Sequence, residues 1–388
     1  MDAKLFAAIL ADKDLQDLRK IKYKYPQADL KEFAELLQIS LCRELPLADF
    51  SGHPLVYLPG KTGLTAGASK LLLQPRYGSE GFGRKAMERE IASTFTIENV
   101  DFTRESVRKI VKGFAPETEE ECRIQGMKLG LEFISDPENK ITEENLYCLY
   151  QMAVEPSLEG ENRLLPGRKY RHDSVFVVGR GVEHAGLSAE KLPEAMGALV
   201  RFAAEEDGMD DLLKGAVLHF YLAYLHPYFD GNGRMARLLH LWFLVQKGYP
   251  SALFVPLSAY VQQSRSGYYK AYRLAEQNAE LSGMLDVTPF LQYFCESVYG
   301  RLQDAQPREE SLREAEEAYL QGTVTAKERD LWNFVLQEYG TDEFSTKQLE
   351  NDFGKAAYAT IYAFVHKFTD LELLEKRAGS ARPRYRVR

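Results

Sequence analysis

The feature that most constrains this 388-residue chain is a pair of apolar segments joined by a short polar loop. The first segment is KGAVLHFYLAYL, the loop is HPYFDGNGRMAR, and the second segment is LLHLWFLVQKGY, which together predict a helix, a loop and a helix. Pro227 disfavours helical geometry at His226, so the first helix should end there. The imidazole of His226 is therefore expected at a helix terminus, where it can face a cleft.

Most of the remaining chain also has apolar residues spaced three and four apart, with no sustained heptad pattern. This predicts helices but no coiled coil. Proline and glycine punctuate the stretch from about Pro46 to Gly83, which we interpret as an irregular connection. Helical periodicity resumes in RKAMEREIASTFTIENV and continues through ITEENLYCLYQMAVE, with interruptions near Pro116 and Pro137.

The sequence offers few strands. The stretch from Lys169 to Val178, KYRHDSVFVV, is the best strand candidate in the middle of the chain, and it predicts a small hairpin beside a helical core. The charged run REESLREAEEAYLQ predicts a solvated connecting helix. After it, the order of helix, short helix, helix and two strands is typical of a winged helix. We therefore expect a mainly α protein with a small β-hairpin and a C-terminal winged-helix-like domain.

The domain bounds expected from these patterns are 1–85 for an N-terminal helical region and irregular connection, and 86–301 for the main domain. A charged linker helix at 302–322 and the winged-helix-like domain at 323–388 follow.

Charge, cysteine content and the N-terminal sequence limit the binding partners and the location that we expect for this protein. A formal net charge of -8 argues against broad binding to nucleic acid or membrane surfaces, and the N-terminus is neither a secretory signal nor a membrane span. The chain has no Cys-x-x-Cys pair that would suggest a zinc or redox site. We therefore expect the four cysteines to be buried thiols in a reducing compartment: Cys42, Cys122, Cys148 and Cys295. We therefore expect a cytoplasmic protein without membrane contact.

The loop between the two apolar segments predicts an anion site. Gly231 and Gly233 permit backbone conformations that turn successive N–H groups toward one point at the start of the second helix, which suits a phosphate. Arg234 and Arg237 are three residues apart, so both can project toward the same anion. Asp230 offers the hard oxygen ligand that Mg²⁺ prefers. Asn232, which lies between the two glycines, could fix the loop or contact a phosphate oxygen.

The segment HPYFDGNGRMAR resembles the signature of the Fic family, His-x-Phe-x-Asp/Glu-Gly-Asn-Gly-Arg-x-x-Arg. It departs from the pattern at Tyr228, where the family usually has Phe, and this change adds a hydroxyl that needs a partner. The resemblance extends over roughly Ala86 to Arg301, with the strand candidate similar to the family's substrate-docking flap. It implies a mostly helical enzyme that moves AMP from ATP to a Ser, Thr or Tyr hydroxyl of a target protein.

Carried over by position, the resemblance makes His226 the base that deprotonates the attacking hydroxyl. Asp230 would hold Mg²⁺, and Gly231, Asn232 and Gly233 would form the anion-binding loop. Arg234 would bind the inner phosphates of ATP, and Arg237 would face the γ-phosphate. Three tyrosines of SRSGYYKAYRLAEQ could border the adenine, although core packing explains them equally well: Tyr268, Tyr269 and Tyr272.

The segment TFTIEN, residues 94–99, resembles the family's inhibitory motif, Ser/Thr-x-x-x-Glu-Gly/Asn. The residues that match its fixed positions are Thr94 and Glu98. A Glu98 carboxylate paired with Arg237 would take the place of the γ-phosphate and prevent ATP from binding in a reactive pose. The resemblance therefore implies an enzyme that inhibits itself.

Two other functions remain open. A phosphotransferase on the same scaffold would move the γ-phosphate instead of AMP, and a nucleotide-sensing regulator would use the tail to bind DNA. Six basic residues and no acid between Lys376 and Arg388 motivate the second alternative. The expected partners are a target-protein hydroxyl, the chain itself as acceptor, DNA or a protein at the C-terminal domain, and a second copy in a homodimer.

Overall fold

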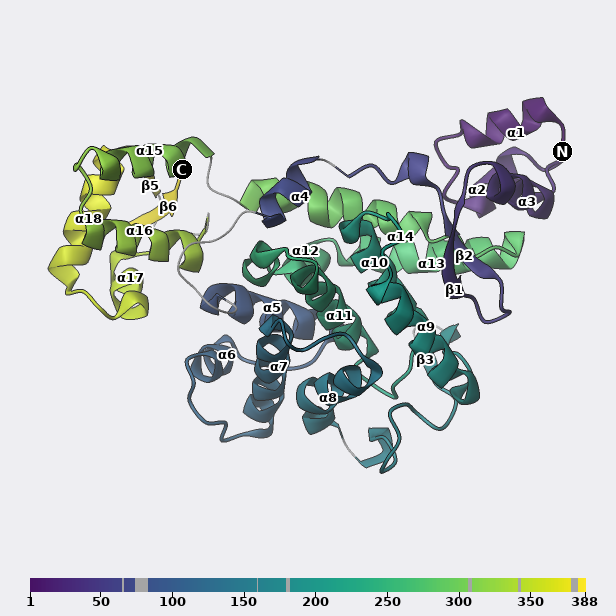
Figure 1. Ribbon diagram of the computed structural model, residues 1–388, viewed down its shortest axis with the longest axis horizontal. Coiled ribbons are helices and arrows are strands. Elements are labelled where there is room, and N and C mark those ends of the chain that lie inside the picture. Colours follow the sequence, from purple (N-terminus) through teal and green to yellow (C-terminus); the bar gives the residue numbers. More distant parts are fainter. Residues whose placement is uncertain are drawn as a thin grey trace.

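The structure is a computed structural model that describes residues 1–64, 66–73, 83–158, 160–178, 182–305, 309–340, 343–377 and 383–388. In this part of the chain the protein is mainly helical, with three antiparallel pairs of short strands. A central helical bundle lies between the N-terminal helices at one end and the C-terminal helices at the other (Figure 1). The predicted mainly α fold is confirmed.

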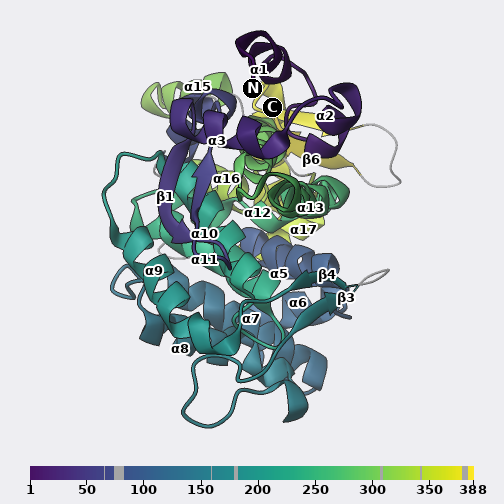
Figure 2. The same ribbon diagram turned by 90° about the vertical axis from the view of Figure 1, so that its right-hand side faces the viewer.

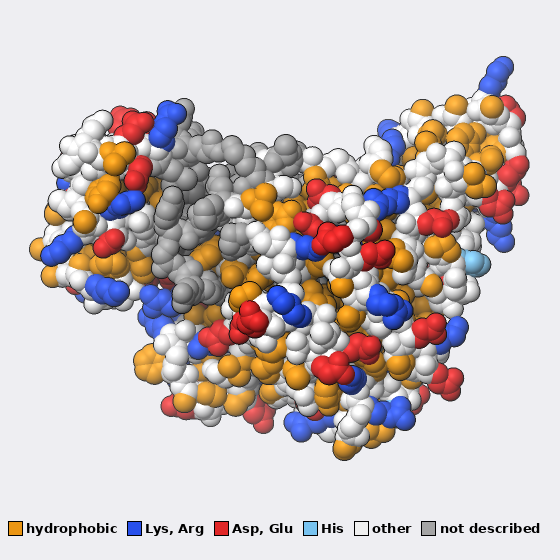
Figure 3. Space-filling model, in the orientation of Figure 1, with side chains coloured by type: hydrophobic (Ala, Val, Ile, Leu, Met, Phe, Trp, Pro, Cys, Tyr) orange, Lys and Arg blue, Asp and Glu red, His pale blue; other side chains and the backbone are white. Residues whose placement is uncertain are grey.

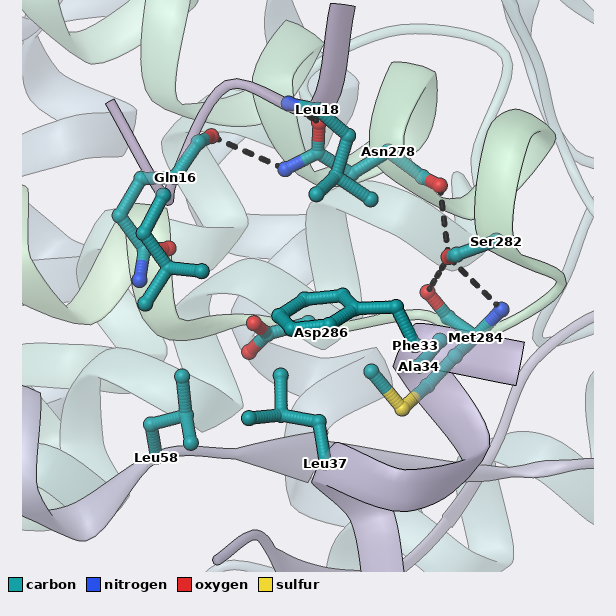
Figure 4. Close-up of a pocket in the computed structure, with 11 residues that line it drawn as sticks. Gln16, Leu18, Phe33, Ala34, Leu37, Leu58, Asn278, Ser282, Met284 and Asp286 are labelled. Atoms are coloured by element: carbon teal, nitrogen blue, oxygen red, sulfur yellow. Dashed lines mark hydrogen bonds between the residues drawn. The ribbon is translucent and has the colours of Figure 1, made fainter. Parts of the chain in front are cut away.

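Three helices open the chain: α1 (Ala3–Leu10), α2 (Leu18–Lys24) and α3 (Leu30–Ser40). Each begins after an aspartate whose side chain accepts a hydrogen bond from a backbone N–H of the first turn. Asn278 ties them to the bundle through Leu18 N and Gln16 O, both at 3.0 Å (Figure 4). The cavity beside Asn278 measures about 20 Å³, enough for one water molecule and far too little for a nucleotide.

A β-hairpin and a short helix lie where the sequence predicted an irregular connection, so that prediction is wrong for residues 46–48, 54–57 and 66–73. Strand β1 (Arg43–Ala48) pairs with β2 (Pro54–Tyr57), and residues of β1 alternate between buried and exposed. Leu45 and Leu47 bury one face of the hairpin, a period-two signal that the surrounding prolines and glycines obscured. Figure 2 shows β1 running beside α9, and Tyr221 of α10 donates a hydrogen bond to Ala48 O at the end of β1 at 3.0 Å. Residues 65 and 74–82 of this stretch lie outside the described residues; helix α4 spans Ala66–Leu73.

The helices of the bundle agree with the predicted periodicity. Their bounds are α5 (Arg84–Glu98), α6 (Arg104–Val111), α7 (Glu119–Ser135), α8 (Glu143–Ala153), α9 (Leu192–Ala204), α10 (Asp211–Leu225), α11 (Asn232–Gln246), α12 (Leu257–Gln263), α13 (Arg265–Ser282) and α14 (Thr288–Tyr293). Shorter helical turns span Pro59–Lys61, Glu155–Ser157, Gly160–Asn162, Ala189–Lys191, Pro250–Phe254, Phe294–Val298 and Tyr299–Ala305. Nearly every side chain of α10 and α11 is buried, so this pair forms the centre of the core.

The predicted strand candidate is confirmed only at its end. Strand β3 (Phe176–Val178) pairs with β4 (Val182–Ala185), and residues 169–175 lead into it as irregular backbone. We call residues 171–178 and 182–187 the flap. The flanking glycines 179 and 181 lie outside the described residues.

The tail has its own hydrophobic core, in which Trp332, Phe344, Phe364 and Tyr385 are buried. Its elements are α15 (Glu309–Leu320), α16 (Ala326–Glu338), α17 (Thr346–Phe353), α18 (Tyr358–Asp370), β5 (Leu374–Arg377) and β6 (Arg384–Val387). This is the predicted order of elements; the winged-helix assignment and the domain bounds stay predictions. Acidic and basic side chains are mixed over the face of the molecule seen in Figure 3.

The expectation of four buried thiols is wrong in part. Cys295 is buried and Cys42 is half-buried, but Cys122 and Cys148 are exposed. These two lie on the outer faces of α7 and α8, whose apolar faces are covered by the bundle. Among the described residues, no helix is long and apolar enough to cross a membrane.

Candidate functional site

The loop between α10 and α11 has the geometry that its residues predict. Helix α10 ends at Leu225, and His226 adopts a left-handed backbone conformation with φ 53°. Gly231, with φ 79°, caps the start of α11. A Cβ atom on Gly231 would lie 2.3 Å from Val154 Cγ1, so only glycine fits beneath α8 at this position.

Asn232 holds this loop closed. Its Oδ1 accepts a hydrogen bond from Tyr228 N at 2.9 Å, and its Nδ2 donates to Tyr228 O at 2.8 Å. The ring of Tyr228 is completely buried and stacks on Tyr150 with centroids 4.0 Å apart. The Tyr228 hydroxyl has no hydrogen-bond partner among the described residues. Of the two roles predicted for Asn232, the structure supports that of fixing the loop.

Both arginines of α11 converge on the carboxylate of Glu98, at the end of α5. Arg234 Nε lies 3.0 Å from Glu98 Oε2, and Arg237 Nη2 hydrogen-bonds Glu98 Oε1. The side chains of Arg234 and Arg237 are 2% and 5% exposed, so these ion pairs are screened little by solvent. Burial disfavours the charge of Arg237, but Glu98 outweighs it and raises the pKa of Arg237 above its ordinary value. The predicted pairing of Glu98 with Arg237 is present, and Arg234 joins it.

Thr94 completes the contact between α5 and α11. Its Oγ1 accepts a hydrogen bond from Arg237 Nε at 2.6 Å, one turn before Glu98 on the same face of α5. Farther along α5, Glu90 is buried and accepts a hydrogen bond from Ser258 N at 3.0 Å. Both residues of the predicted motif therefore face α11, and α5 is held in place along its length.

Gly233, which has no side chain, leaves space for the carboxylate of Glu98. A Cβ atom at Gly233 would lie 2.5 Å from Glu98 Oε1 and 3.2 Å from Arg237 Nη1. Helix N-termini present backbone N–H groups without intrahelical partners, and the positive end of the helix dipole favours negative charge. The N-terminus of α11 thus forms a cradle for an anion, in which the carboxylate of Glu98 now lies.

His226 is half-buried, and its surroundings favour the neutral imidazole. Burial, reinforced by the neighbouring His184, lowers the pKa of His226 to about 4. His184 is itself held by Glu276, with Nδ1 2.7 Å from the carboxylate, and by Tyr224 O at 2.7 Å. A neutral imidazole can accept a proton at pH 7.

Asp230 is the one predicted metal ligand. Its side chain is 55% exposed; Oδ1 accepts a hydrogen bond from Gly231 N at 2.6 Å, and Oδ2 lies 3.4 Å from Arg234 Nη2. No group of three or more metal-binding side chains occurs among the described residues. This donor set fits Mg²⁺, which is commonly held by one or two carboxylates while substrate phosphates and water complete its coordination.

The three tyrosines of α13 separate into two environments. Tyr268 is 3% exposed and its hydroxyl lies 2.8 Å from His219 Nε2, while Tyr272 packs against Phe220 and Phe290. Both have the core-packing role that the sequence left open. Tyr269 is 38% exposed and donates to Ile97 O at 3.3 Å, next to Glu98. The adenine-bordering role stays a prediction, and of the three tyrosines Tyr269 has the most accessible ring.

Sequence reasoning missed three residues of this region. Ser157 Oγ accepts a hydrogen bond from Arg234 Nη1 at 3.0 Å, and Arg171 donates from Nε to His226 O at 2.7 Å. Gly186 lies so close to His226 that a Cβ atom there would be 3.0 Å from His226 Cβ. These three residues lie outside the segment HPYFDGNGRMAR, and the sequence around them contains no motif that would identify them as part of the site.

Comparison with known proteins finds sequences similar to the region that contains this loop. Residues 140–244 match the model of the Fic/DOC family. Over 186 residues the chain is 27% identical to the protein adenylyltransferase Fic of Drosophila ananassae and 26% identical to that of Drosophila melanogaster. These matches cover 46% of this chain, which spans about a third of the length of the curated relatives: 32% and 33%.

Solved structures of the same family are also similar. A Fic family protein from Desulfovibrio desulfuricans is 20% identical with a TM-score of 0.49, covering 82% of this chain and 90% of that one. A fragment of Fic-1 from C. elegans is 20% identical with a TM-score of 0.45, covering 61% of this chain and 69% of that one. The match of residues 140–244, which contain the loop and both arginines, carries the assignment. Residues 140–244 of this chain are therefore similar to the Fic/DOC family.

Proposed function

We propose that this chain transfers AMP from ATP to a hydroxyl group of a protein, with His226 as the base. The observation that carries the proposal is the convergence of Arg234 and Arg237 on one carboxylate, at the helix N-terminus that follows the His226 loop. A site that holds a carboxylate with two buried arginines and a helix N-terminus also suits a phosphate. The relatives named protein adenylyltransferase support AMP transfer as the reaction.

ATP would bind with its phosphates over the N-terminus of α11. Arg234 would bind the inner phosphates, Arg237 would face the γ-phosphate, and the backbone of residues 231–233 would surround them. Asp230 would hold a Mg²⁺ ion together with the phosphates, and that ion, when bound, would neutralise part of their charge. Such a site accelerates phosphate chemistry mainly by positioning and by stabilising charge.

In the proposed reaction, the oxygen of the acceptor hydroxyl forms a bond to the α-phosphorus of ATP. The bond from the α-phosphorus to the oxygen that bridges to the β-phosphate breaks, and pyrophosphate leaves with the electron pair. The hydroxyl proton passes to a ring nitrogen of His226. The lowered pKa of His226 keeps this imidazole neutral before the reaction, and the negative charge of bound ATP would raise the pKa toward neutrality.

A protein acceptor would lie along the flap. Strands β3 and β4 form a two-stranded pair, whose outer edges can hydrogen-bond an extended segment of another protein. Phe176 on β3 is 56% exposed and offers an apolar contact. Gly186, directly after β4, lies against His226, so a segment bound along β4 would reach the base.

Glu98 would act as the inhibitor of this reaction. Its carboxylate engages the same two arginines that the proposal assigns to the phosphates of ATP. A carboxylate and a phosphate cannot occupy one place, so ATP can bind productively only when the end of α5 withdraws. The resting protein would therefore transfer AMP slowly.

The test uses ATP labelled on the α-phosphate or, separately, on the γ-phosphate, with wild type and Glu98→Gly in Mg²⁺ and cell lysate, scoring self-labelling as well. Label from the α-phosphate alone, stronger in Glu98→Gly, is the expected result. Label from the γ-phosphate alone would replace the proposal with phosphotransfer. No label from either position, with ATP still bound by Glu98→Gly, would favour a nucleotide-sensing regulator.

A further inference from the structure

Arg171, at the base of the flap, is a buried arginine that forms no ion pair with the described residues, although the charge of nearby Asp173 favours its protonated form. It is 1% exposed, and its three hydrogen bonds in the described part of the chain all go to backbone carbonyls. Nε donates to His226 O at 2.7 Å, Nη1 donates to Asp173 O, and Nη2 donates to Leu187 O. One guanidinium thus joins the His226 loop to the start and the end of the flap.

This contact is energetically costly, because the buried guanidinium of Arg171 loses its hydration and forms no ion pair with the described residues. Even a buried ion pair can often be replaced by apolar side chains of similar volume without loss of stability. Filling the core therefore does not require an arginine here. The planar guanidinium does offer five donors in a fixed fork, which can hold several acceptors in one arrangement.

The backbone around Arg171 reinforces the same junction. Arg171 N donates to Pro227 O at 3.0 Å, so the first leg of the flap is tied to the residue after His226. Leu187 N donates to Leu225 O at 3.1 Å, which ties the second leg to the residue before His226. The two legs are joined to each other by Gly186 N and Val175 O at 3.1 Å.

Gly186 allows the close approach that Arg171 requires. A Cβ atom on Gly186 would lie 2.7 Å from Arg171 Nη2, 2.8 Å from Val175 Cγ1 and 3.0 Å from His226 Cβ. A larger residue would separate the flap from both the guanidinium and the base. The junction therefore depends on a large donor on one leg and on the absence of a side chain on the other.

We propose that Arg171 is a positioning residue that sets the distance between the flap and His226. An acceptor bound along the flap then presents its hydroxyl to the imidazole at a fixed place. The inference rests on the proposed AMP transfer for its purpose, but the contact itself is testable without activity. Arg171 contacts neither Glu98 nor Arg237, so its loss should leave the anion site intact.

The primary experiment is hydrogen exchange on the full chain carrying Arg171→Met. A hydrogen bond from a charged donor contributes about 1.5–3 kcal/mol, which corresponds to about 10- to 150-fold faster exchange when opening of the flap limits it. We expect this increase in residues 172–178 and 182–187, with the first turn of α11 unchanged. Arg168→Met, the same substitution at an exposed arginine three residues away, is the matched control. Unchanged flap exchange in Arg171→Met would overturn the inference.

A second variant covers the case in which Arg171→Met unfolds. Gly186→Ala keeps the arginine and its charge but inserts a methyl group into the junction, so it should produce the same local increase in exchange. If Gly186→Ala folds and its flap exchanges at the wild-type rate, the proposed junction is contradicted. The same conclusion follows if Arg171→Met leaves flap exchange unchanged. An increase spread evenly over the bundle in both variants would assign Arg171 a general structural role and likewise reject positioning.

The activity arm adds Arg171→Met to Glu98→Gly and measures self-labelling from α-labelled ATP together with ATP affinity by calorimetry. We expect transfer to fall about 10-fold or more while the dissociation constant of ATP changes less than twofold, since the positioning contact involves the acceptor. An equal loss of ATP affinity would contradict positioning. Absence of transfer in Glu98→Gly itself would instead refute the proposed function, and hydrogen exchange would still decide the role of Arg171.

Discussion

Two buried arginine contacts flank His226, and they differ in what accepts their hydrogen bonds. At the start of α11, Arg234 and Arg237 bind the carboxylate of Glu98, which belongs to a different helix. At the base of the flap, the hydrogen bonds of the Arg171 guanidinium to described residues all go to backbone carbonyls, one of them that of His226 itself. The first contact joins full charges, and the second joins a full charge to neutral dipoles.

This difference separates an exchangeable contact from a permanent one. A carboxylate can be replaced by another anion if its helix end moves, and a phosphate satisfies the same arginines with similar geometry. A backbone carbonyl cannot leave without rebuilding the loop around it. Under the proposed function, the anion site serves regulation and ATP binding, whereas the flap junction holds one geometry.

The largest effect is expected at His226, which lies between the two contacts. His226→Ala in the Glu98→Gly background should lower transfer by about 10²–10⁴-fold, the usual contribution of a general base. ATP affinity should hardly change, because the arginines remain. Label transfer and calorimetry measure both quantities, with the exposed His53→Ala as control. Full activity of His226→Ala would show that His226 is not the base of the reaction.

The next effect tests whether the charged contact is exchangeable. Glu98→Gly should raise the rate of AMP transfer about 10-fold or more, because even one of the charge-assisted hydrogen bonds that ATP no longer has to displace contributes about 1.5–3 kcal/mol. Glu98→Gln, which keeps the shape without the charge, should fall between wild type and Glu98→Gly. If all three proteins transfer AMP at the same rate, Glu98 is a structural partner of the arginines, and its contact with them is not exchangeable.

A smaller effect concerns pH. Because burial and His184 lower the pKa of His226 to about 4, the free enzyme keeps the neutral base down to acidic pH. The kcat/KM of Glu98→Gly should therefore change less than threefold between pH 7.5 and about 5.5 and fall only as pH approaches 4, whereas a base with an ordinary histidine pKa of about 6.5 would lose about tenfold by pH 5.5. Mg²⁺ is kept saturating, and melting temperature is followed over the same range. Half-maximal kcat/KM near pH 6.5 would refute the neutral, buried base.

The smallest effect distinguishes a satisfied polar contact from an unsatisfied one. Tyr228→Phe removes a buried hydroxyl that has no partner among the described residues, so it should raise the free energy of unfolding by about 1 kcal/mol. Tyr299→Phe is the matched control, because its hydroxyl donates to Leu212 O at 2.8 Å and lies next to His240. That variant should lose about 1 kcal/mol. Denaturant unfolding measures both, and equal changes in the two would mean that the Tyr228 hydroxyl is satisfied.

Local chemistry made much of the candidate site predictable. Pro227 ends α10 at Leu225, Gly231 starts α11, and the spacing of Arg234 and Arg237 places both on one face, as the sequence predicted. These features depend on the conformational limits of proline and glycine and on the helical repeat, which act over a few residues. The hairpin of β1 and β2 escaped prediction because its alternating leucines lie among prolines and glycines that are also typical of irregular chain.

The sequence by itself determined the helical architecture, the His226 loop and, through resemblance to the Fic family, the pairing of Glu98 with Arg237. Only the tertiary structure decided that Arg234 shares this carboxylate, that Tyr268 belongs to the core, and that Arg171 ties the flap to the base. The physical reason is range: caps, turns and periodicity are encoded in neighbouring residues, whereas the acceptors of a buried arginine come from segments that meet only after folding. Arg171 and His226 are 55 residues apart in the chain and 2.7 Å apart between Nε and the carbonyl oxygen.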